Sequence, residues 1–309
     1  MENRYVKDLQ FIIENYLHEL TTLDCSKQIK EKKEFIFSNI EDIFAFHKVL
    51  FLAQLLETEG ENEKLSSVFV KNRAYFELYI PYTLNRHYSE STINSYEIIR
   101  KFFDDINIRI GHYDNWISDY LNRPLDRIVQ YRNFLQEQIK YAVRAKQSSL
   151  SLQDAYFMFC DLFKSIETRQ LINSIQNLPF EFMGRLERLF RFDSFYVIDA
   201  DGRQRERFLF LFKDCLLICR LKPRTTAETI STTINNQLGA IISGTSSLPN
   251  YFKGALVFKN IIPLGAIKSI KLDNFEDSDE KLLIELGLDQ ASLQLSSTTM
   301  TPLHDSSET

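Results

Sequence analysis

Apolar side chains recur every three or four positions along residues 36–56, which is the spacing of a helix and not of a strand. One face of this helix would carry Phe37, Ile40, Phe44, His47 and Phe51, flanked by Ile36, Ile43 and Leu50. A face this wide predicts that most of the helix is buried. A single histidine in such a row is more often a core residue that bonds to a neighbour than a metal ligand or a catalytic base. We therefore expect His47 to be structural.

Helical spacing continues from Tyr5 to about Ile175 with few helix breakers. The pattern predicts helices over residues 5–20, 36–56, 64–84, 91–106, 123–145 and 151–175. Ser91 is a candidate N-cap, Pro81 should kink or end the third helix, and Pro124 suits a first turn. Long amphipathic helices in this order predict an elongated helical bundle.

Beyond residue 180 the hydrophobic period becomes that of strands. The segments GRLERLFRF, DSFYVID, RERFLFLF and DCLLICR predict an antiparallel meander, and ALVFKNIIPLGAIKSIKL resumes it. Residues 223–250 are rich in Thr, Ser and Asn, so we expect a disordered insertion there, and residues 289–309 should be a disordered tail. Cys215 and Cys219 would share one face of a strand, where core packing is favoured over redox chemistry.

The composition argues against several classes of function. The net charge is −5, and residues 273–309 hold nine acidic residues against one lysine, so the rest of the chain is nearly neutral and nucleic-acid binding is not expected. The four cysteines form no CxxC pair, which disfavours a zinc site or a disulfide framework and favours a reducing, cytoplasmic location. No signal-peptide pattern and no apolar run of membrane-spanning length is present.

Catalytic signatures such as GxGxxG, GxxxxGK[ST], HExxH and GxSxG are absent from the sequence. Acidic pairs such as Asp104 and Asp105 are typical of solvated helix ends and not of general acids. We therefore expect no catalytic residue, no metal and no cofactor, and a function that depends on surface contact.

Three motifs give a family resemblance. ENRYVKDLQFIIENYL with IFSNIEDIFAFHKVLFLAQLL resembles the first conserved region of the Dbl-homology (DH) domain, the exchange module that acts on Rho-type GTPases. YIPYTLNRHYSESTI resembles its second region, and YLNRPLDRIVQYRNFLQEQIKYA resembles its third, usually KPxQRxxKYxLLLKELLK. The β segment resembles the pleckstrin-homology (PH) domain that follows such modules. The resemblance implies a mainly α protein with a DH bundle at 1–178 and an incomplete antiparallel PH-like barrel at 179–288.

By this resemblance the protein is a guanine-nucleotide exchange factor that stabilises the nucleotide-free state of a Rho-family GTPase. Glu2 stands where the family's first-helix glutamate meets switch I of the GTPase. Three further contact positions depart from the family pattern: Asp126 replaces glutamine, Gln130 replaces a basic residue, and Glu167 replaces asparagine. These departures keep a second hypothesis open, that of a weak or inactive scaffold which binds a GTPase or a cytoskeletal partner.

The β half carries further expectations. The only tryptophan is Trp116, so the tryptophan-bearing helix that ends a PH domain has no counterpart and the domain is expected to be truncated. The short link RFDS between its first two strands leaves little of the basic loop that grips phosphoinositide head groups, so the nearby arginines favour a solvated basic edge and at most a weak peripheral membrane or phosphoinositide contact. Glu2 is so close to the first residue that we also expect an upstream region. The DSFYV and RERFLFLF segments are nearest to the triple-domain and obscurin-like subgroup, which would place the protein near the cytoskeleton.

Overall fold

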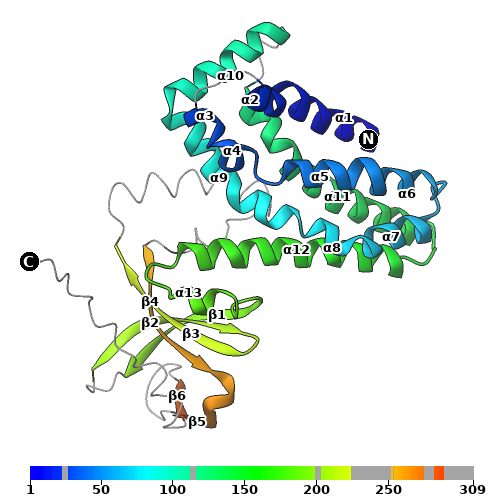
Figure 1. Ribbon diagram of the computed structural model, residues 1–309. Coiled ribbons are helices and arrows are strands. Elements are labelled where there is room, and N and C mark those ends of the chain that lie inside the picture. Colours follow the sequence, from blue (N-terminus) through cyan, green and yellow to red (C-terminus); the bar gives the residue numbers. More distant parts are fainter. Residues whose placement is uncertain are drawn as a thin grey trace, which may run out of the picture. The chain divides into compact units, whose positions relative to one another are not determined.

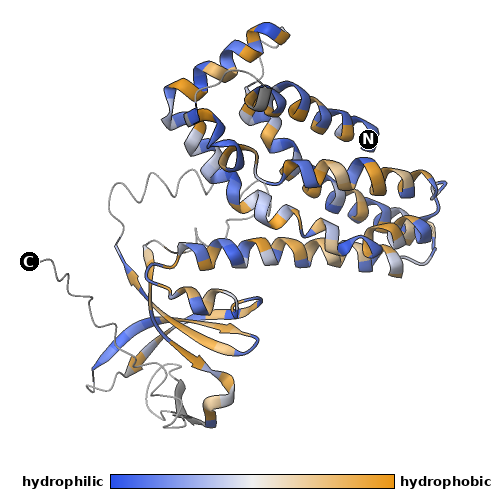
Figure 2. Ribbon diagram, in the orientation of Figure 1, coloured by the Kyte–Doolittle hydropathy of each residue, from blue (hydrophilic) through white to orange (hydrophobic). Residues whose placement is uncertain are grey.

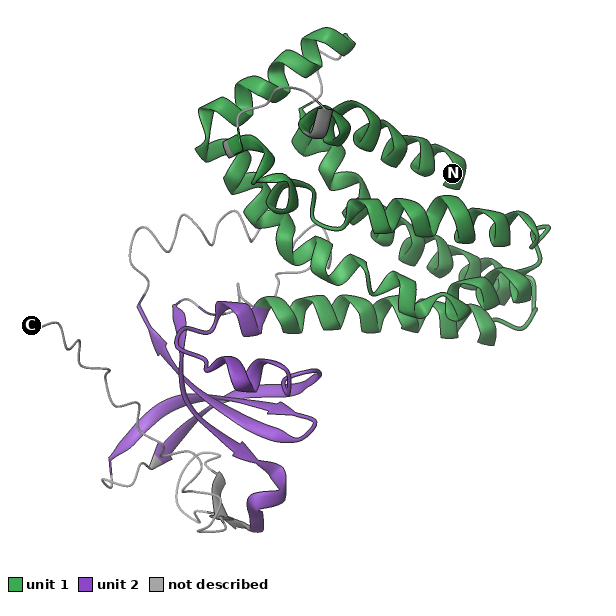
Figure 3. Ribbon diagram, in the orientation of Figure 1, with its two compact units in different colours: residues 1–170, 225–251 green, residues 171–224, 252–309 purple. Residues whose placement is uncertain are grey.

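The computed structural model describes residues 1–22, 27–111, 116–198, 203–223, 252, 254–274 and 282–288. The chain divides into two compact units, one within residues 1–170 and the other within residues 171–224 and 252–309 (Figure 3). The division falls inside a helix, N-terminal to the domain boundary expected after residue 178. The predicted insertion and tail lie outside the described residues, apart from Pro223. The exact domain boundaries stay predictions.

Helices build the first unit (Figure 1). They are α1 (Glu2–Ile12), the π-helix η1 (Ile13–Leu17), α2 (His18–Thr22), α3 (Lys27–Lys30), α4 (Lys33–Phe37), α5 (Ile40–Ala45), the π-helix η2 (Phe46–Phe51), α6 (Leu52–Leu56), α7 (Asn62–Lys71), α8 (Arg73–Phe76), α9 (Tyr79–Ser95), α10 (Glu97–Ile110), α11 (Ile117–Arg144) and the first part of α12 (Leu150–Ser174). Figure 2 shows hydrophobic and hydrophilic residues alternating along most of them, as the sequence pattern predicted.

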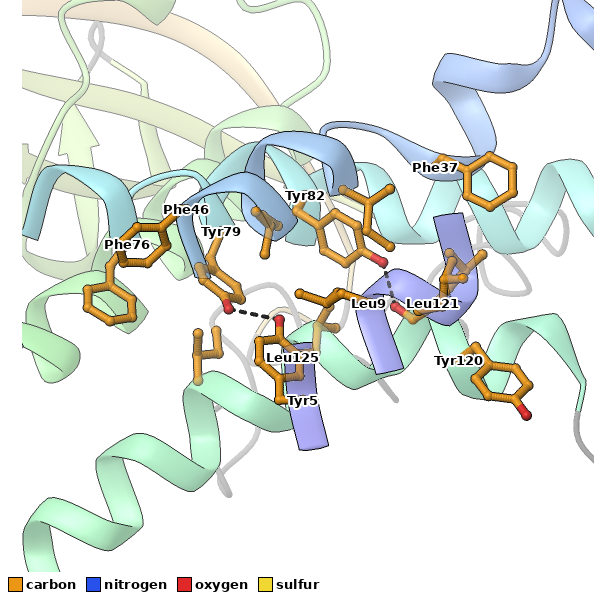
Figure 4. Close-up of a cluster of buried hydrophobic side chains, with 14 of the residues drawn as sticks. Tyr5, Leu9, Phe37, Phe46, Phe76, Tyr79, Tyr82, Tyr120, Leu121 and Leu125 are labelled. Carbon is orange, nitrogen blue, oxygen red and sulfur yellow. Dashed lines mark hydrogen bonds between the residues drawn. The ribbon is translucent and has the colours of Figure 1, made fainter. Parts of the chain in front are cut away.

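Aromatic side chains fill the core of this unit. Phe51, Phe76 and Tyr131 are each at most 4% exposed, and their ring centroids lie 5.2–5.8 Å apart in edge-to-face pairs. Figure 4 shows the hydroxyl groups of Tyr5 on α1 and Tyr79 on α9 pointing toward one another, and the hydroxyl of Tyr82 donates to the carbonyl of Leu121 on α11 at 2.7 Å. Burial of each such ring contributes about 1.5–3 kcal/mol, so these contacts fix where the helices meet.

Several helix limits differ from the prediction, each for a local reason. The helix expected over residues 36–56 is interrupted at Ser38, where φ is +49°. The helix expected over residues 64–84 breaks at residues 77–78, and Pro81 lies in the first turn of the next helix, α9, so the predicted end of regular helix near Pro81 is confirmed. Ser91 lies inside α9, and the break comes at Tyr96, which has extended backbone angles.

Pro124 lies inside α11 and not in its first turn, because the helix already begins at Ile117. A proline there removes one backbone hydrogen bond. Side chains of α9 bond to carbonyls of the same stretch: Tyr82 Oη donates to Leu121 O, and Arg86 Nη2 donates to Ser118 O at 3.0 Å. Contacts with α9 therefore help to stabilise this part of α11.

Strands build most of the second unit (Figure 1). After α13 (Phe180–Met183) come β1 (Leu189–Ile198), β2 (Gln204–Phe212), β3 (Cys215–Lys222), β4 (Ala255–Pro263), the short 3-10 helix η3 (Leu264–Ala266), β5 (Ile267–Asn274) and β6 (Leu282–Leu288). Strands β1 to β4 form an antiparallel sheet in chain order, and β5 pairs with β6. The predicted mainly α bundle followed by an antiparallel β part is confirmed.

The register of the sheet aligns its buried residues. Phe192 pairs with Phe210, Phe210 with Leu217, and Leu217 with Ile261, so one row across four strands reaches the core. The segments LFRF and DSFYVI, expected to be two strands, form the single strand β1, whose register shifts only between Leu189 and Arg191. Cys215 and Cys219 are buried on one face of β3, which confirms that they pack in the core.

Candidate functional site

Glu2, the first residue of α1, is 8% exposed and lies within hydrogen-bonding distance of three side chains from two other elements. Arg127 Nη2 and the hydroxyl of Tyr131, both on α11, donate to its Oε2 at 2.5 and 2.6 Å. His47 Nδ1, on η2, lies 2.7 Å from Oε1. Arg127 and Tyr131 are four residues apart, so one face of α11 presents both to the carboxylate. The three elements are thus joined at one buried anion.

A chain of hydroxyl groups continues behind His47. The hydroxyl of Tyr79, on α9, lies 2.8 Å from His47 Nε2. The hydroxyl of Tyr5 lies 2.9 Å from that of Tyr79, and Figure 4 shows this second contact. If Tyr5 donates to Tyr79 and Tyr79 donates to Nε2, then His47 carries its proton on Nδ1 and donates it to Glu2. A neutral histidine with this tautomer therefore satisfies every bond in the chain.

The charge states agree with this arrangement. Burial raises the pKa of the Glu2 carboxyl, but the hydrogen bond from His47 and the charge of Arg127 lower it more strongly, so its pKa is about 2. Burial lowers the pKa of His47, and Arg127 acts in the same direction against the opposing effect of Glu2. Glu2 is therefore ionised and His47 neutral near pH 7. The prediction that His47 packs inside the bundle is confirmed, since it is 0% exposed.

The other predicted contact residues lie on α11 and α12. Gln130 is exposed, and its Oε1 accepts a hydrogen bond from Arg127 Nη1 at 3.1 Å, so the structure links it to Glu2 through Arg127. Asp126 and Glu167 are half-buried and form no hydrogen bond or ion pair with this network among the described residues. Burial raises the pKa of both carboxyls. The GTPase contacts predicted for these residues and for Glu2 stay predictions.

Arg86 is a buried charge that the sequence reasoning missed. It lies on α9 at 2% exposure, and its guanidinium donates to Asn122 Oδ1 at 2.8 Å and to the carbonyl of Ser118 at 3.0 Å. Arg86 follows Tyr79 by seven residues and Tyr82 by four, which places it on the apolar face of α9. This spacing was the sequence signal that could have indicated its burial. The pairing of Glu2 with Arg127 had no local signal, because 125 positions separate the two residues.

The residues that the structure describes contain neither a cluster of metal ligands nor a membrane-spanning helix. Within these ranges, His, Cys, Asp and Glu side chains form no group of three or more that could hold a metal ion. No helix in the described part of the chain is long and apolar enough to cross a membrane.

Comparison with known proteins identifies the domain family that contains this site. A sequence model described as the RhoGEF domain matches residues 1–167, which is more than half of the chain. Rho guanine nucleotide exchange factor 25 of Rattus norvegicus is 26% identical over 225 residues, covering 70% of this chain and 38% of that protein. The muscle M-line assembly protein unc-89 of Caenorhabditis elegans is 24% identical over 216 residues, covering 70% of this chain and 3% of that protein.

A solved structure on the PH and C1 domains of the Vav1 exchange factor shares the fold. Its TM-score is 0.52 at 21% identity, and the match covers 94% of this chain and 72% of that chain. The helical bundle and the open sheet therefore have the architecture of DH and PH modules. This chain spans well under half of the length of the curated relatives named above. Because the family match includes both α1 and α11, which hold the Glu2 site, the site lies within the recognised domain, and the chain belongs to the RhoGEF domain family.

Proposed function

We propose that this chain is a guanine-nucleotide exchange factor that binds the nucleotide-free state of a Rho-family small GTPase and promotes GDP release and GTP loading. The observation that carries the proposal is the RhoGEF domain match over residues 1–167. The curated relatives named as Rho guanine nucleotide exchange factors support the same activity. The buried Glu2 network lies in this matched region and offers a fixed, ionised acceptor at the start of α1.

The proposed mechanism requires no side-chain acid or base. If the helical unit binds the empty GTPase more tightly than the GDP-bound form, thermodynamic linkage requires that it weaken nucleotide binding by the same factor. A hundredfold faster release corresponds to about 2.7 kcal/mol of extra stabilisation of the transition state. A few hydrogen bonds and charge pairs at the interface can supply that amount. Excess cellular GTP then sets the direction of exchange.

Release of a fluorescent nucleotide from a panel of Rho-type GTPases tests the proposal. The chain should accelerate release from at least one of them, and it should bind that GTPase more tightly when empty than when loaded with GDP and magnesium. Equal affinity for both states, with no acceleration on any member, would contradict the proposal.

A scaffold that binds a GTPase or a cytoskeletal partner without exchange is the second candidate. Asp126, Gln130 and Glu167 favour it, because they alter the charge at positions that approach the GTPase in the family resemblance. The relative named as a muscle M-line assembly protein supports a cytoskeletal setting. Tight binding with equal affinity for the empty and loaded GTPase would favour this candidate over the exchange factor.

We also propose a weak contact between the β1–β2 hairpin and a membrane surface. Arg205 and Arg207 on β2 pair with Val197 and Phe195 on β1, so cations and apolar groups alternate across one hairpin. Such a surface supports a weak, peripheral association with anionic lipid head groups. Sedimentation with vesicles containing a phosphoinositide, compared with neutral vesicles, tests it, and equal sedimentation with both would remove the contact.

A further inference from the structure

The Glu2 carboxylate is almost, but not completely, saturated with hydrogen bonds. A carboxylate offers about four acceptor positions, two on each oxygen. Arg127 and Tyr131 occupy both positions on Oε2, whereas His47 occupies one on Oε1. One acceptor position on Oε1 therefore stays open, and the bond from His47 decides where it points.

We propose that His47 is a positioning residue of the exchange site, which holds Glu2 so that the open lone pair of Oε1 receives one hydroxyl or backbone N–H donor of the GTPase. This inference rests on the proposed exchange function. It gives His47 a role beyond core packing, because the histidine acts on the partner through Glu2 without touching it.

The contacts around His47 explain why its ring cannot turn away from Glu2. The ring stacks on that of Tyr131, with centroids 6.2 Å apart and an angle of 6° between the planes. Edge contacts from Tyr5 and Phe51 lie at 5.0 and 5.4 Å. On the far side Tyr79 fixes Nε2 at 2.8 Å. Packing and hydrogen bonding therefore leave Nδ1 a single direction, toward Oε1.

Two substitutions of His47 separate positioning from packing. Asparagine places an amide N–H close to where Nδ1 lies, so His47→Asn can keep the bond to Glu2 while losing the acceptor for Tyr79. Glutamine reaches the position of Nε2, so His47→Gln can keep the bond with Tyr79 while losing the donor to Glu2. Each variant loses one of two buried bonds, so both should unfold at similarly reduced urea concentrations.

Nucleotide release gives the first readout, measured per folded molecule on a GTPase that the unaltered chain activates. We expect nucleotide release with His47→Gln to be about tenfold slower than with His47→Asn, because a charge-assisted bond from residue 47 no longer orients the Glu2 carboxylate. A purely structural His47 predicts equal rates for the two variants once the folded fraction is taken into account. Equal rates would overturn the positioning role.

Titration of the Glu2 carboxyl by carbon-13 NMR gives a second readout that needs no GTPase. The pKa of about 2 should rise in His47→Gln and stay low in His47→Asn. An unchanged pKa in both variants would also overturn the proposal. The two failures are distinguishable: an unaltered chain that activates no GTPase overturns the proposed function, whereas an active chain with equally fast variants overturns only the role of His47.

Discussion

Arg127 and Arg86 are both almost fully buried in the helical unit, at 6% and 2% exposure, but their surroundings differ. Arg127 forms an ion pair with Glu2, and its guanidinium also lies 4.5 Å from the ring centroid of Tyr131. Arg86 donates only to neutral acceptors, the amide of Asn122, a backbone carbonyl and the hydroxyl of Ser89. None of the described carboxylates forms an ion pair with it.

This difference distinguishes the charged site around Glu2 and Arg127 from Arg86, which links helices structurally. In a buried ion pair, removal of one charged partner is costly because the other charge stays buried and uncompensated. A buried cation whose hydrogen bonds go only to neutral groups has no ion-pair partner to leave uncompensated, and it joins helices through its donors. The Glu2 site should therefore be sensitive to charge, and the Arg86 site to the number and geometry of donors. The following predictions test that contrast.

The largest effect should come from breaking the Glu2 ion pair. Arg127→Met should lower the free energy of unfolding by about 3–5 kcal/mol, because Glu2 is left as a buried charge without a counter-ion. Glu2→Gln should also be costly, since it leaves Arg127 unpaired. The double variant should cost clearly less than the sum of the two, as measured by urea unfolding followed through helical circular dichroism.

An exposed pair on the same helix provides the control. Lys140 and Glu137 on α11 form an ion pair at 2.7 Å with both side chains about half exposed, and Glu137→Gln should cost less than about 1 kcal/mol. If Arg127→Met costs no more than this control, or if the double cycle is additive, then the Glu2 pair does not behave as a buried ion pair.

The pH dependence of stability should report Glu2 and His47 separately. Glu2 has an ordinary pKa of 4.5 and a folded pKa of about 2, so its contribution is complete above pH 4.5 and is lost as the pH falls toward 2, a loss of about 3 kcal/mol. The folded pKa of His47 lies below its ordinary 6.5, so the unfolded chain binds the proton first and stability falls as the pH drops below 6.5.

Subtraction isolates each group in that experiment. The free energy of unfolding is measured across pH 2–8 for the unaltered chain and for His47→Asn. The difference between the two values should change with pH only below about pH 6.5. The difference from Glu2→Gln should have its slope below about 4.5. If stability instead rises as the pH falls through either window, then the inferred charge state of that group, ionised for Glu2 or neutral for His47, is wrong.

Arg86 should show an intermediate effect governed by its donors. Arg86→Met should lower the free energy of unfolding by about 1–3 kcal/mol, because Asn122 and the carbonyl of Ser118 lose a partner while the buried charge is also removed. Arg86→Lys should cost at least as much, since the ammonium keeps the charge but cannot reproduce the planar set of donors. Urea unfolding checks this order, and a lysine variant as stable as the parent would contradict it.

Local periodicity predicted the parts of this fold that depend on neighbours in sequence. The burial of His47 and the shared face of Cys215 and Cys219 followed from spacing alone. Pro124 did not follow, because the helix N-terminal to it is stabilised by packing against α9 that no local pattern encodes. The partners of Glu2 come from η2 and α11, and although Arg127 and Tyr131 lie within the segment that resembles the third family region, no sequence pattern paired them with Glu2.

The smallest effect concerns the two half-buried carboxylates that depart from the family pattern. By resemblance Asp126 and Glu167 approach a GTPase surface that carries acidic side chains, so both would meet like charge there. Since burial already raises the pKa of both carboxyls, neutral amides should cost little stability. The variant Asp126→Gln, Glu167→Asn should speed nucleotide release by up to about tenfold, or about 1.4 kcal/mol, with a smaller gain at high salt.

Gln130 should respond in the opposite direction, although restoring a basic residue there also matches the family. Its Oε1 accepts a hydrogen bond from Arg127 Nη1 at 3.1 Å, so Gln130→Lys removes that acceptor and places a second cation beside Arg127. The repulsion weakens the group that holds Glu2, so this variant should release nucleotide no faster than the parent. If Gln130→Lys is the faster variant and the two amide substitutions change nothing, then the charge at Asp126 and Glu167 does not limit exchange, and the link between Gln130 and Arg127 does not support the Glu2 site.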